Sequence, residues 1–369
     1  MEEFSREKIE KLKEYDFFGR NNNSKDFESD IKTNLICGKH KEDPPFVTIL
    51  ITTYRRPDTL KYAIESAIHQ EGFSDYEIIV SDNSGEECYY ADTEKLVRSF
   101  QCDKLIYYRH EKTMVSKSTR AVNLVKTKWL CFLHDDDVLA SNHLRVMSHI
   151  IRNNPQIAFL GGKMCAFTDK LDAIIDYKRL TQAFHGEYLV EYLDYKSYNY
   201  GFVGTWLGAF IDREKFLLNG AMDDLTQPMI GDYIMVAKYA YYYGTYLCDA
   251  PLYGYRIWEN QVSSSSAITW QNCYTTEYYL YKYISCKRNY LFRPFFCKLS
   301  KYKILEKVQE LTRGPYKFHI KMERFKEICE VDKEDIHDKE YAAYIALYDY
   351  LHKYRKKLLM RYAIRGKIN

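Results

Sequence analysis

The stretch FVTILITTYRRPDTLKYAIESAIHQEGFSDYEIIVSD, residues 46–82, decides the fold. Residues 46–54 form an almost continuous apolar run, which predicts a strand that is buried on both faces. Apolar residues then recur at helical spacing after Pro57, which predicts a helix that begins there. Residues 76–82 form a second apolar strand. An apolar strand, a helix and another apolar strand in this order are typical of a parallel sheet.

The same alternation continues along the chain. Residues 104–110 predict a third strand, Ser116–Lys126 a helix, and WLCFLH, residues 129–134, a fourth strand. Because these strands are apolar throughout instead of alternating, the pattern predicts an α/β fold with a doubly wound, mostly parallel sheet and helices on both faces. A C-terminal helical region follows this fold.

Polar residues stand where the predicted strands end. The strand-end residues are Thr52, Thr53, Ser81, Asp82, Asn83, Asp135, Asp136 and Asp137. Ligands of parallel α/β sheets bind beyond the carboxyl ends of the strands, so we expect one shared crevice. Neither a GxGxxG turn nor a GxxxxGK[ST] loop occurs, which argues against a dinucleotide held on a glycine-rich turn and against a P-loop.

Composition limits the remaining function classes. The chain has 369 residues and a net charge of only +3, which does not indicate nucleic-acid binding. Three segments are predicted: a polar N-terminal extension over 1–44, an α/β domain over 45–265, and a Tyr-rich basic helical region over 266–369. Scattered cysteines and a charged N-terminus without an apolar core favour a cytoplasmic location, and no apolar run is long enough to span a membrane.

Three consecutive carboxylates follow the fourth strand in WLCFLHDDDVL, residues 129–139. These carboxylates repel one another, so we expect a cation close to them. Mg²⁺ or Mn²⁺ takes oxygen ligands and bridges substrate phosphates, so a divalent cation is the predicted partner. The alternative is an acidic loop in which one aspartate caps the next helix and the others are solvated.

Four segments resemble, in order and approximate spacing, the motifs of inverting family 2 glycosyltransferases with the GT-A fold. They are VTILITTYRRPDTLKYAIESAIHQ (47–70), YEIIVSDNSGEE (76–87), WLCFLHDDDVLASNHL (129–144) and GDYIMVAKYAYYYGTYLCDAPLYGYRIWENQVS (231–263). The resemblance covers residues 46–264 and identifies 45–265 as a catalytic domain. It implies transfer of a sugar from a nucleotide-diphosphate donor, with Mn²⁺ or Mg²⁺ held against the diphosphate.

The resemblance also implies roles for individual residues. Thr53 and Tyr54 match nucleotide contacts, and Asp82 matches the aspartate that hydrogen-bonds the base, usually uracil. Asp135, Asp136 and Asp137 match the DXD region; Asp137 ranks first as metal ligand, with Asp135 or Asp136 as the ribose contact or second metal contact. The family often has D-x-D-D here, which would place His134 at the first acidic position and leaves the register open by one residue.

Further residues are predicted to contact the acceptor or the donor phosphates. Asp232 matches the aspartate that takes the acceptor proton, although it is also predicted as the N-cap of its helix. Arg120 and Arg256 are candidate donor phosphate contacts. Trp206 and Trp258 are candidate acceptor contacts, with packing in the core as the alternative for both.

The predicted partners are a UDP-sugar, a saccharide or lipid-linked saccharide acceptor, and the inner face of the plasma membrane. The membrane contact rests on a basic amphipathic stripe over 351–365, for which docking on the catalytic domain or another subunit is the alternative. The sequence does not decide whether the protein forms an oligomer.

Members of the resembled family commonly build surface polysaccharides, which indicates synthesis of a bacterial capsule or O-antigen. The alternative function is a non-catalytic nucleotide-sugar-binding assembly subunit. A dehalogenase-like phosphatase fits poorly, because its motif needs Thr or Val at Leu139.

Overall fold

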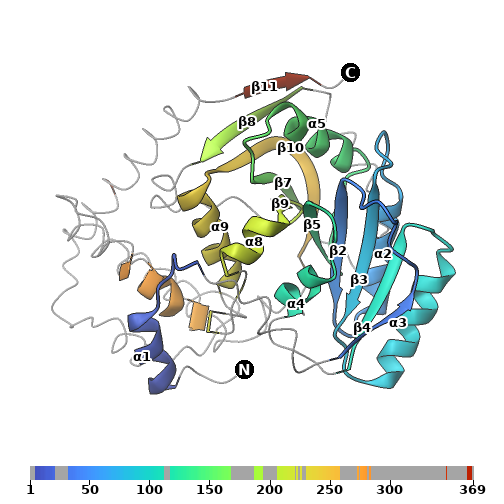
Figure 1. Ribbon diagram of the computed structural model, residues 1–369, viewed down its shortest axis with the longest axis horizontal. Helices are drawn as coiled ribbons and strands as arrows, with labels where there is room; N and C mark the ends of the chain where they lie inside the picture. Colours follow the sequence, from blue (N-terminus) through green and yellow to red (C-terminus); the bar gives the residue numbers. More distant parts are fainter. Residues whose placement is uncertain are drawn as a thin grey trace.

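In the computed structural model a large mixed sheet organises the chain (Figure 1). The sheet order is β1-β4-β3-β2-β5-β9-β7-β10-β8-β11, and the short β6 pairs with β10. The structure describes residues 5–20, 32–111, 117–167, 187–193, 206–257 apart from 221, 223–224 and 227–229, 272–283 apart from 274 and 281, 346, and 364–367. Helices cover both faces of the sheet, so the predicted α/β class is confirmed.

The first half of the sheet is parallel, as predicted. Its strands are β2 (Val47–Thr53), β3 (Tyr76–Asp82), β4 (Leu105–His110) and β5 (Trp129–His134), and the pairs β2–β3, β2–β5 and β3–β4 are all parallel. The connecting helices are α2 (Pro57–Ile68), α3 (Glu87–Ser99) and α4 (Lys117–Asn123). The bounds of the four strands and of α2 and α4 lie close to the predicted ones, because long apolar runs between helical repeats mark parallel strands clearly, whereas α3 was not predicted.

The second half mixes both strand directions. Its elements are β6 (Val138–Leu139), α5 (His143–Asn153), β7 (Phe159–Phe167), β8 (Glu187–Leu193), β9 (Phe210–Asp212), α8 (Arg213–Leu218), α9 (Gly231–Tyr242) and β10 (Thr245–Arg256). The long β10 pairs in parallel with β7 and antiparallel with β6 and β8. It therefore joins the loop after β5 to the far half of the sheet.

The core has two layers, one on each face of the sheet. On β2, Ile49 and Ile51 face one layer, while Leu50 faces the other. The first layer packs against α2, α3 and α5, and the second packs against α4, α8 and α9. Side chains along a strand point alternately to opposite faces, so a strand that is apolar at every position is buried from both sides.

Both ends of the chain add strands to this sheet. Within the predicted N-terminal extension, α1 (Arg6–Glu14) is followed by β1 (Thr33–Cys37), which pairs antiparallel with β4. At the other end, β11 (Ile364–Lys367) pairs antiparallel with β8. The prediction of a helical region over residues 266–369 is therefore wrong for residues 364–367, which form a strand. An open edge of β8 offers these residues ladder hydrogen bonds, and Gly366 is a poor helix former.

The rest of the C-terminal region is described only in part. Residues 275–280 and 282–283, which belong to the predicted Tyr-rich helical region, are helical. The amphipathic stripe over 351–365 lies almost wholly outside the described residues. None of the helices in the described ranges combines the length and apolar character that crossing a bilayer requires.

We expect His143 to make the fold sensitive to acid. Its Nδ1 donates to the Leu252 carbonyl at 3.0 Å, and burial lowers its pKa from 6.5 to about 4. Between these values the unfolded chain binds a proton that the folded chain does not, so stability falls as the pH falls from 6.5 toward 4. The full shift corresponds to about 3 kcal/mol.

Urea unfolding of wild type and His143→Gln at pH 7 and pH 4.5 measures this contribution. The variant loses part of the acid-induced decrease in the free energy of unfolding, because glutamine takes up no proton. His149→Gln, an exposed change on the same helix, is the control and leaves the decrease intact. Equal pH dependence in His143→Gln and wild type would refute the assignment.

Candidate active site

The predicted strand-end residues meet at one edge of the sheet. Thr53 of β2 lies opposite Asp82 of β3, and Thr52 lies opposite His134 of β5. This register brings the turn Asp135–Asp137 beside the end of β2. The parallel pairing therefore places the three strand ends next to one another, as expected from the sequence.

Asp135 is tied to the end of β2. Its Oδ2 accepts hydrogen bonds from the Thr53 hydroxyl at 2.9 Å and from the Tyr54 backbone N–H at 3.2 Å. Thr53 and Tyr54, the predicted nucleotide contacts, thus lie against the acidic turn. Asp135 acts here as an anchor between two strand ends.

Arg56 supplies positive charge to the acidic turn. Its Nη1 lies 3.4 Å from Asp135 Oδ1 and 3.0 Å from Asp136 Oδ2. Arg56 was not among the predicted site residues, although the YRRP segment follows a strand that ends in the predicted crevice. Between Tyr54 and Arg56, Arg55 adopts a positive φ of 57°, a conformation that costs about 1–3 kcal/mol outside glycine.

Contacts with the β3–α3 loop hold Arg55 in that conformation. The Ser84 hydroxyl accepts from the Arg55 backbone N–H at 3.0 Å, and the Ser84 carbonyl accepts from Arg55 Nε at 2.9 Å. Arg55 also pairs with Glu86. The β2–α2 turn is therefore fixed by the neighbouring loop, and that turn carries Arg56.

Asp137 is fully buried and held by β10. Tyr253 donates its hydroxyl to Asp137 Oδ2 at 2.6 Å, and the Arg256 backbone N–H donates to Oδ1 at 2.8 Å. Burial, with further repulsion from Asp136 and Asp135, raises the pKa of Asp137 to about 8, against these two hydrogen bonds. Because burial is the largest cause of this shift, a cation beside the carboxyl would lower its pKa again.

The side chains of Arg256 and Tyr253 each pack against the backbone of another segment. Arg256 donates from Nε to the Asp136 carbonyl at 2.8 Å, so the predicted phosphate contact also clamps the acidic turn. Gly208, with a φ of +67°, lies against the Tyr253 ring, and a β-carbon there would come within 2.5 Å of it. Sequence reasoning missed Tyr253, since its spacing from the aspartates carries no local signal.

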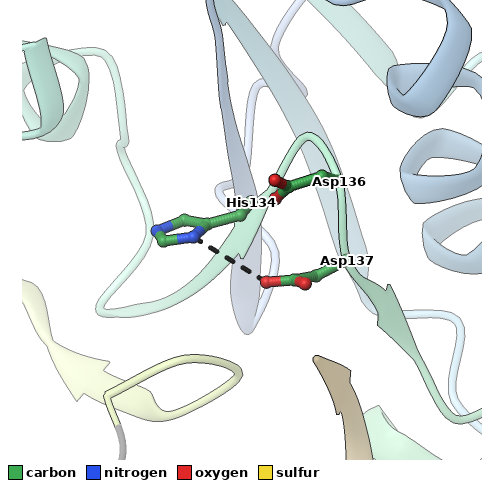
Figure 2. A group of neighbouring side chains, drawn as sticks. All are labelled: His134, Asp136 and Asp137. Atoms are coloured by element: carbon green, nitrogen blue, oxygen red, sulfur yellow. Dashed lines mark ion pairs between the residues drawn. The ribbon is translucent and has the colours of Figure 1, made fainter. Parts of the chain in front are cut away.

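His134, Asp136 and Asp137 form a candidate metal site. One ligand atom from each lies within 4.8 Å of the others, and His134 Nδ1 is 3.7 Å from Asp137 Oδ2 (Figure 2). Two carboxylates suit Mg²⁺ or Mn²⁺, whereas the imidazole nitrogen suits a transition metal better than Mg²⁺. The residues present therefore fit Mn²⁺. Asp135, predicted as a second ligand, lies outside this group and binds Thr53 and Tyr54.

Asp82 lies at the end of β3, beside Thr53 of β2. It is fully buried, and its oxygens accept from the Ser84 backbone N–H at 2.9 Å, the Ser84 hydroxyl at 2.5 Å and the Tyr107 hydroxyl at 2.8 Å. Burial raises its pKa despite these donors. Its predicted contact with the base stays a prediction. Arg120 of α4 is buried, and its charge helps to lower the pKa of His110.

Asp232 lies in the first turn of α9 and contacts Trp206. The indole N–H of Trp206 donates to Asp232 Oδ2 at 3.0 Å, while Oδ1 accepts from the Tyr233 backbone N–H at 2.9 Å. The N-cap is Ile230 and Asp232 is the second residue of the helix, so the alternative assignment of Asp232 as the N-cap is wrong. Removal from water raises the pKa of this carboxylate.

Trp206 connects Asp232 to the acidic cluster. Its ring packs edge-on against His134, with centroids 5.3 Å apart, and against Phe132 at 4.9 Å. The predicted base and the candidate metal site are thus joined through one indole. Trp258, the other predicted acceptor contact, lies outside the described residues.

We expect Arg56→Met to destabilise the fold through the acidic turn. The change leaves Asp135 and Asp136 buried without their cation, and breaking such a pair costs up to about 3–5 kcal/mol when it is fully buried. Arg56 is 26% exposed, so a loss of about 1–3 kcal/mol is expected. Thermal unfolding with and without Mn²⁺ measures it.

Mn²⁺ should restore part of the lost stability in Arg56→Met and raise its melting temperature more than that of wild type. Lys61→Met, an exposed change on α2, is the control. Identical melting temperatures for Arg56→Met and wild type would show that Arg56 does not compensate the aspartates.

Comparison with known families locates this site in a named domain. Residues 48–206 match the model of glycosyl transferase family 2. That range begins in β2, includes the acidic turn, and ends at Trp206. Asp232 and Arg256 lie beyond it.

Two curated relatives of part of the chain are also named glycosyltransferases. An uncharacterized glycosyltransferase of Methanocaldococcus jannaschii is 28% identical over 123 residues, which is 32% of this chain and 41% of that protein. One of Rickettsia bellii is 28% identical over 110 residues, 29% of this chain and 15% of that protein. The chain therefore matches less than half the length of these curated relatives.

Two solved structures are similar at low sequence identity. Staphylococcus aureus TarS 1–349 in complex with UDP-GlcNAc has a TM-score of 0.47 and 11% identity, covering 79% of this chain and 93% of that chain. The mannosyltransferase PcManGT of Pyrobaculum calidifontis, in complex with GDP-Man and Mn²⁺, has a TM-score of 0.47 and 10% identity, covering 89% and 91%. The family match, the names of the two curated relatives and the ordered motifs agree, and the predicted family is confirmed for the matched range: residues 48–206 form a glycosyl transferase family 2 domain.

Proposed function

We propose that this chain is a metal-dependent inverting glycosyltransferase. It transfers a sugar from a nucleotide-diphosphate donor, a UDP-sugar, to a hydroxyl of a saccharide or lipid-linked saccharide. One observation carries the proposal: the family 2 match coincides with a buried acidic turn at the strand ends, and Trp206 links that turn to Asp232.

Asp232 acts as the base in this proposal. In an inverting transfer, the acceptor oxygen attacks the anomeric carbon from one face while the bond to the diphosphate breaks on the other. A carboxylate on the acceptor side takes the proton of the hydroxyl as the new C–O bond forms. The raised pKa of Asp232 strengthens it as a base, and the Trp206 N–H fixes one of its oxygens.

The acidic turn binds the donor side. His134, Asp136 and Asp137 would hold Mn²⁺, which when bound neutralises charge on the leaving diphosphate. Arg56 lies against the same turn and is positioned to contact donor oxygens. Tyr253 and the Arg256 backbone keep Asp137 oriented, so that these residues stay arranged before the donor arrives.

The proposal also includes the pathway and the location of the enzyme in the cell. The family's usual work supports synthesis of a bacterial capsule or O-antigen in the cytoplasm. A contact of residues 351–365 with the inner face of the plasma membrane stays a prediction from the sequence. The competing function is a non-catalytic nucleotide-sugar-binding assembly subunit, which would bind donor without needing Asp232.

We expect UDP binding to depend on a divalent cation through the acidic turn. Calorimetry with UDP in Mn²⁺ or in a chelator should show tighter binding with Mn²⁺. Asp136→Asn and Asp137→Ala should each weaken the Mn²⁺-dependent part by at least about tenfold, with Asp137→Ala the larger. Circular dichroism of each variant checks that it is folded.

Asp103→Asn, an exposed change away from the site, serves as the control and should bind UDP as wild type does. UDP affinity that is equal with and without the chelator, in wild type and both variants, would exclude a metal at this turn.

Asp232→Asn should slow turnover strongly without affecting donor binding. Asparagine keeps the shape and still accepts from Trp206 through its amide oxygen, but it cannot take the acceptor proton. General-base contributions are about a hundred- to ten-thousand-fold, so the transfer rate should fall by at least about a hundredfold. Release of nucleoside diphosphate in the presence of acceptor measures the rate, and calorimetry measures donor affinity.

The control is Glu214→Gln, an exposed carboxylate change on the neighbouring helix α8. An Asp232→Asn variant that transfers near the wild-type rate shows that Asp232 is not the base. If transfer is absent in wild type while donor binding persists, the non-catalytic alternative is favoured.

A further inference from the structure

A second surface lies at the opposite edge of the parallel strands. Two pockets of about 460 and 560 Å³ open where these strands begin, whereas the acidic turn lies where they end. Phe46 and Trp129, at the starts of β2 and β5, line the first pocket, and Tyr76, at the start of β3, lines the second. The volumes lie in the range of small-ligand sites.

Arg152 forms the wall that the two pockets share. It lines both, and its guanidinium carbon lies 4.9 Å from the ring centre of Phe46 and 5.3 Å from that of Phe73. The two rings meet edge-on with centroids 5.9 Å apart. This contact joins the pockets into one elongated surface, with a cation at its middle.

Two further cations lie on aromatic rings along this surface. Lys104 Nζ is 4.0 Å from the ring centre of Tyr76, and Lys128 Nζ is 5.5 Å from that of Trp129. Within the described part of the chain, neither lysine nor Arg152 forms a salt bridge. Asp75 is the one acidic residue among the described residues that line the pockets.

Interaction with a helix dipole can account for the position of only one of these three cations. Arg152 lies in the last turn of α5, where a cation interacts favourably with the helix dipole. Lys104 and Lys128 precede β4 and β5, so no helix end accounts for them. Stacking on rings holds these side chains in place and leaves their N–H donors available for an anionic ligand.

We propose that these two pockets form a binding site for an anionic saccharide chain. Carboxylate or phosphate groups of the chain pair with Arg152, Lys104 and Lys128, and the apolar faces of its sugar rings pack on the aromatic and proline side chains of the pockets. The choice of a saccharide over another anion rests on the proposed function. The site lies away from the acidic turn, and it holds a distant segment of the glycan that the enzyme extends.

Binding of oligogalacturonate to the full-length protein tests the site. The methyl-esterified form of the same oligomer is the matched ligand, since it keeps the sugar rings and lacks the charges. Calorimetry without nucleotide should show binding of the acid form that weakens with salt, and much weaker binding of the ester. Arg152→Gln should weaken binding by about tenfold, the value of one charge-assisted hydrogen bond.

Lys104→Gln and Lys128→Gln should also weaken binding, whereas Lys95→Gln, an exposed lysine on α3 outside the pockets, should not. UDP binding should persist in all variants, which shows that they are folded and keeps the two proposals separate. A wild-type protein that binds the oligomer but no UDP contradicts the proposed function alone.

Three results would overturn the site: no binding of the acid oligomer at millimolar concentration, equal binding of the ester, or unchanged affinity in Arg152→Gln. Vesicles containing phosphatidylglycerol form a separate arm. If the three variants lose vesicle binding and keep oligomer binding, the surface binds lipid and the saccharide proposal fails.

Discussion

The acidic turn after β5 is the constraint on which the rest of the site depends. Three adjacent carboxylates in a buried turn repel one another and lose hydration, so each needs a specific donor or cation. Asp135 takes donors from the end of β2, Asp136 takes Arg56, and Asp137 takes Tyr253. Since β2 and β10 belong to different halves of the sheet, the turn holds both halves together at the point where a ligand would bind.

The burial of this turn has a chemical consequence. Arg56 lies against two of the three aspartates, and burial keeps the pKa of Asp137 well above its ordinary value. A cation that entered the turn would favour the ionised form of Asp137, and His134 adds a ligand atom to the two carboxylates. The contacts of the three aspartates with Thr53, Arg56 and Tyr253 also explain why the apolar strand β5 can be followed by three carboxylates in a folded protein.

The mixed half of the sheet contributes the acceptor side of the proposed reaction. Trp206 lies between β5 and α9, in contact with both His134 and Asp232. An indole can pack its ring against one group while its N–H binds another, which is why a single side chain can couple the two. At the opposite end of the parallel strands, Arg152 lies on the rings of Phe46 and Phe73, far from the carboxylates of the acidic turn.

The sequence by itself determined the parallel strands, their helices and the meeting of Thr53 with the acidic turn. Those features depend on apolar periodicity and on the rule that parallel strands end at one edge. Only the tertiary structure showed that Arg56 and Tyr253 hold the aspartates, that β11 continues the sheet where a helix was predicted, and that Asp232 lies inside its helix. Arg56 and Asp136 are 80 positions apart, and Tyr253 and Asp137 are 116 apart. Contacts over such separations depend on strand register and packing, which no local pattern of residues encodes.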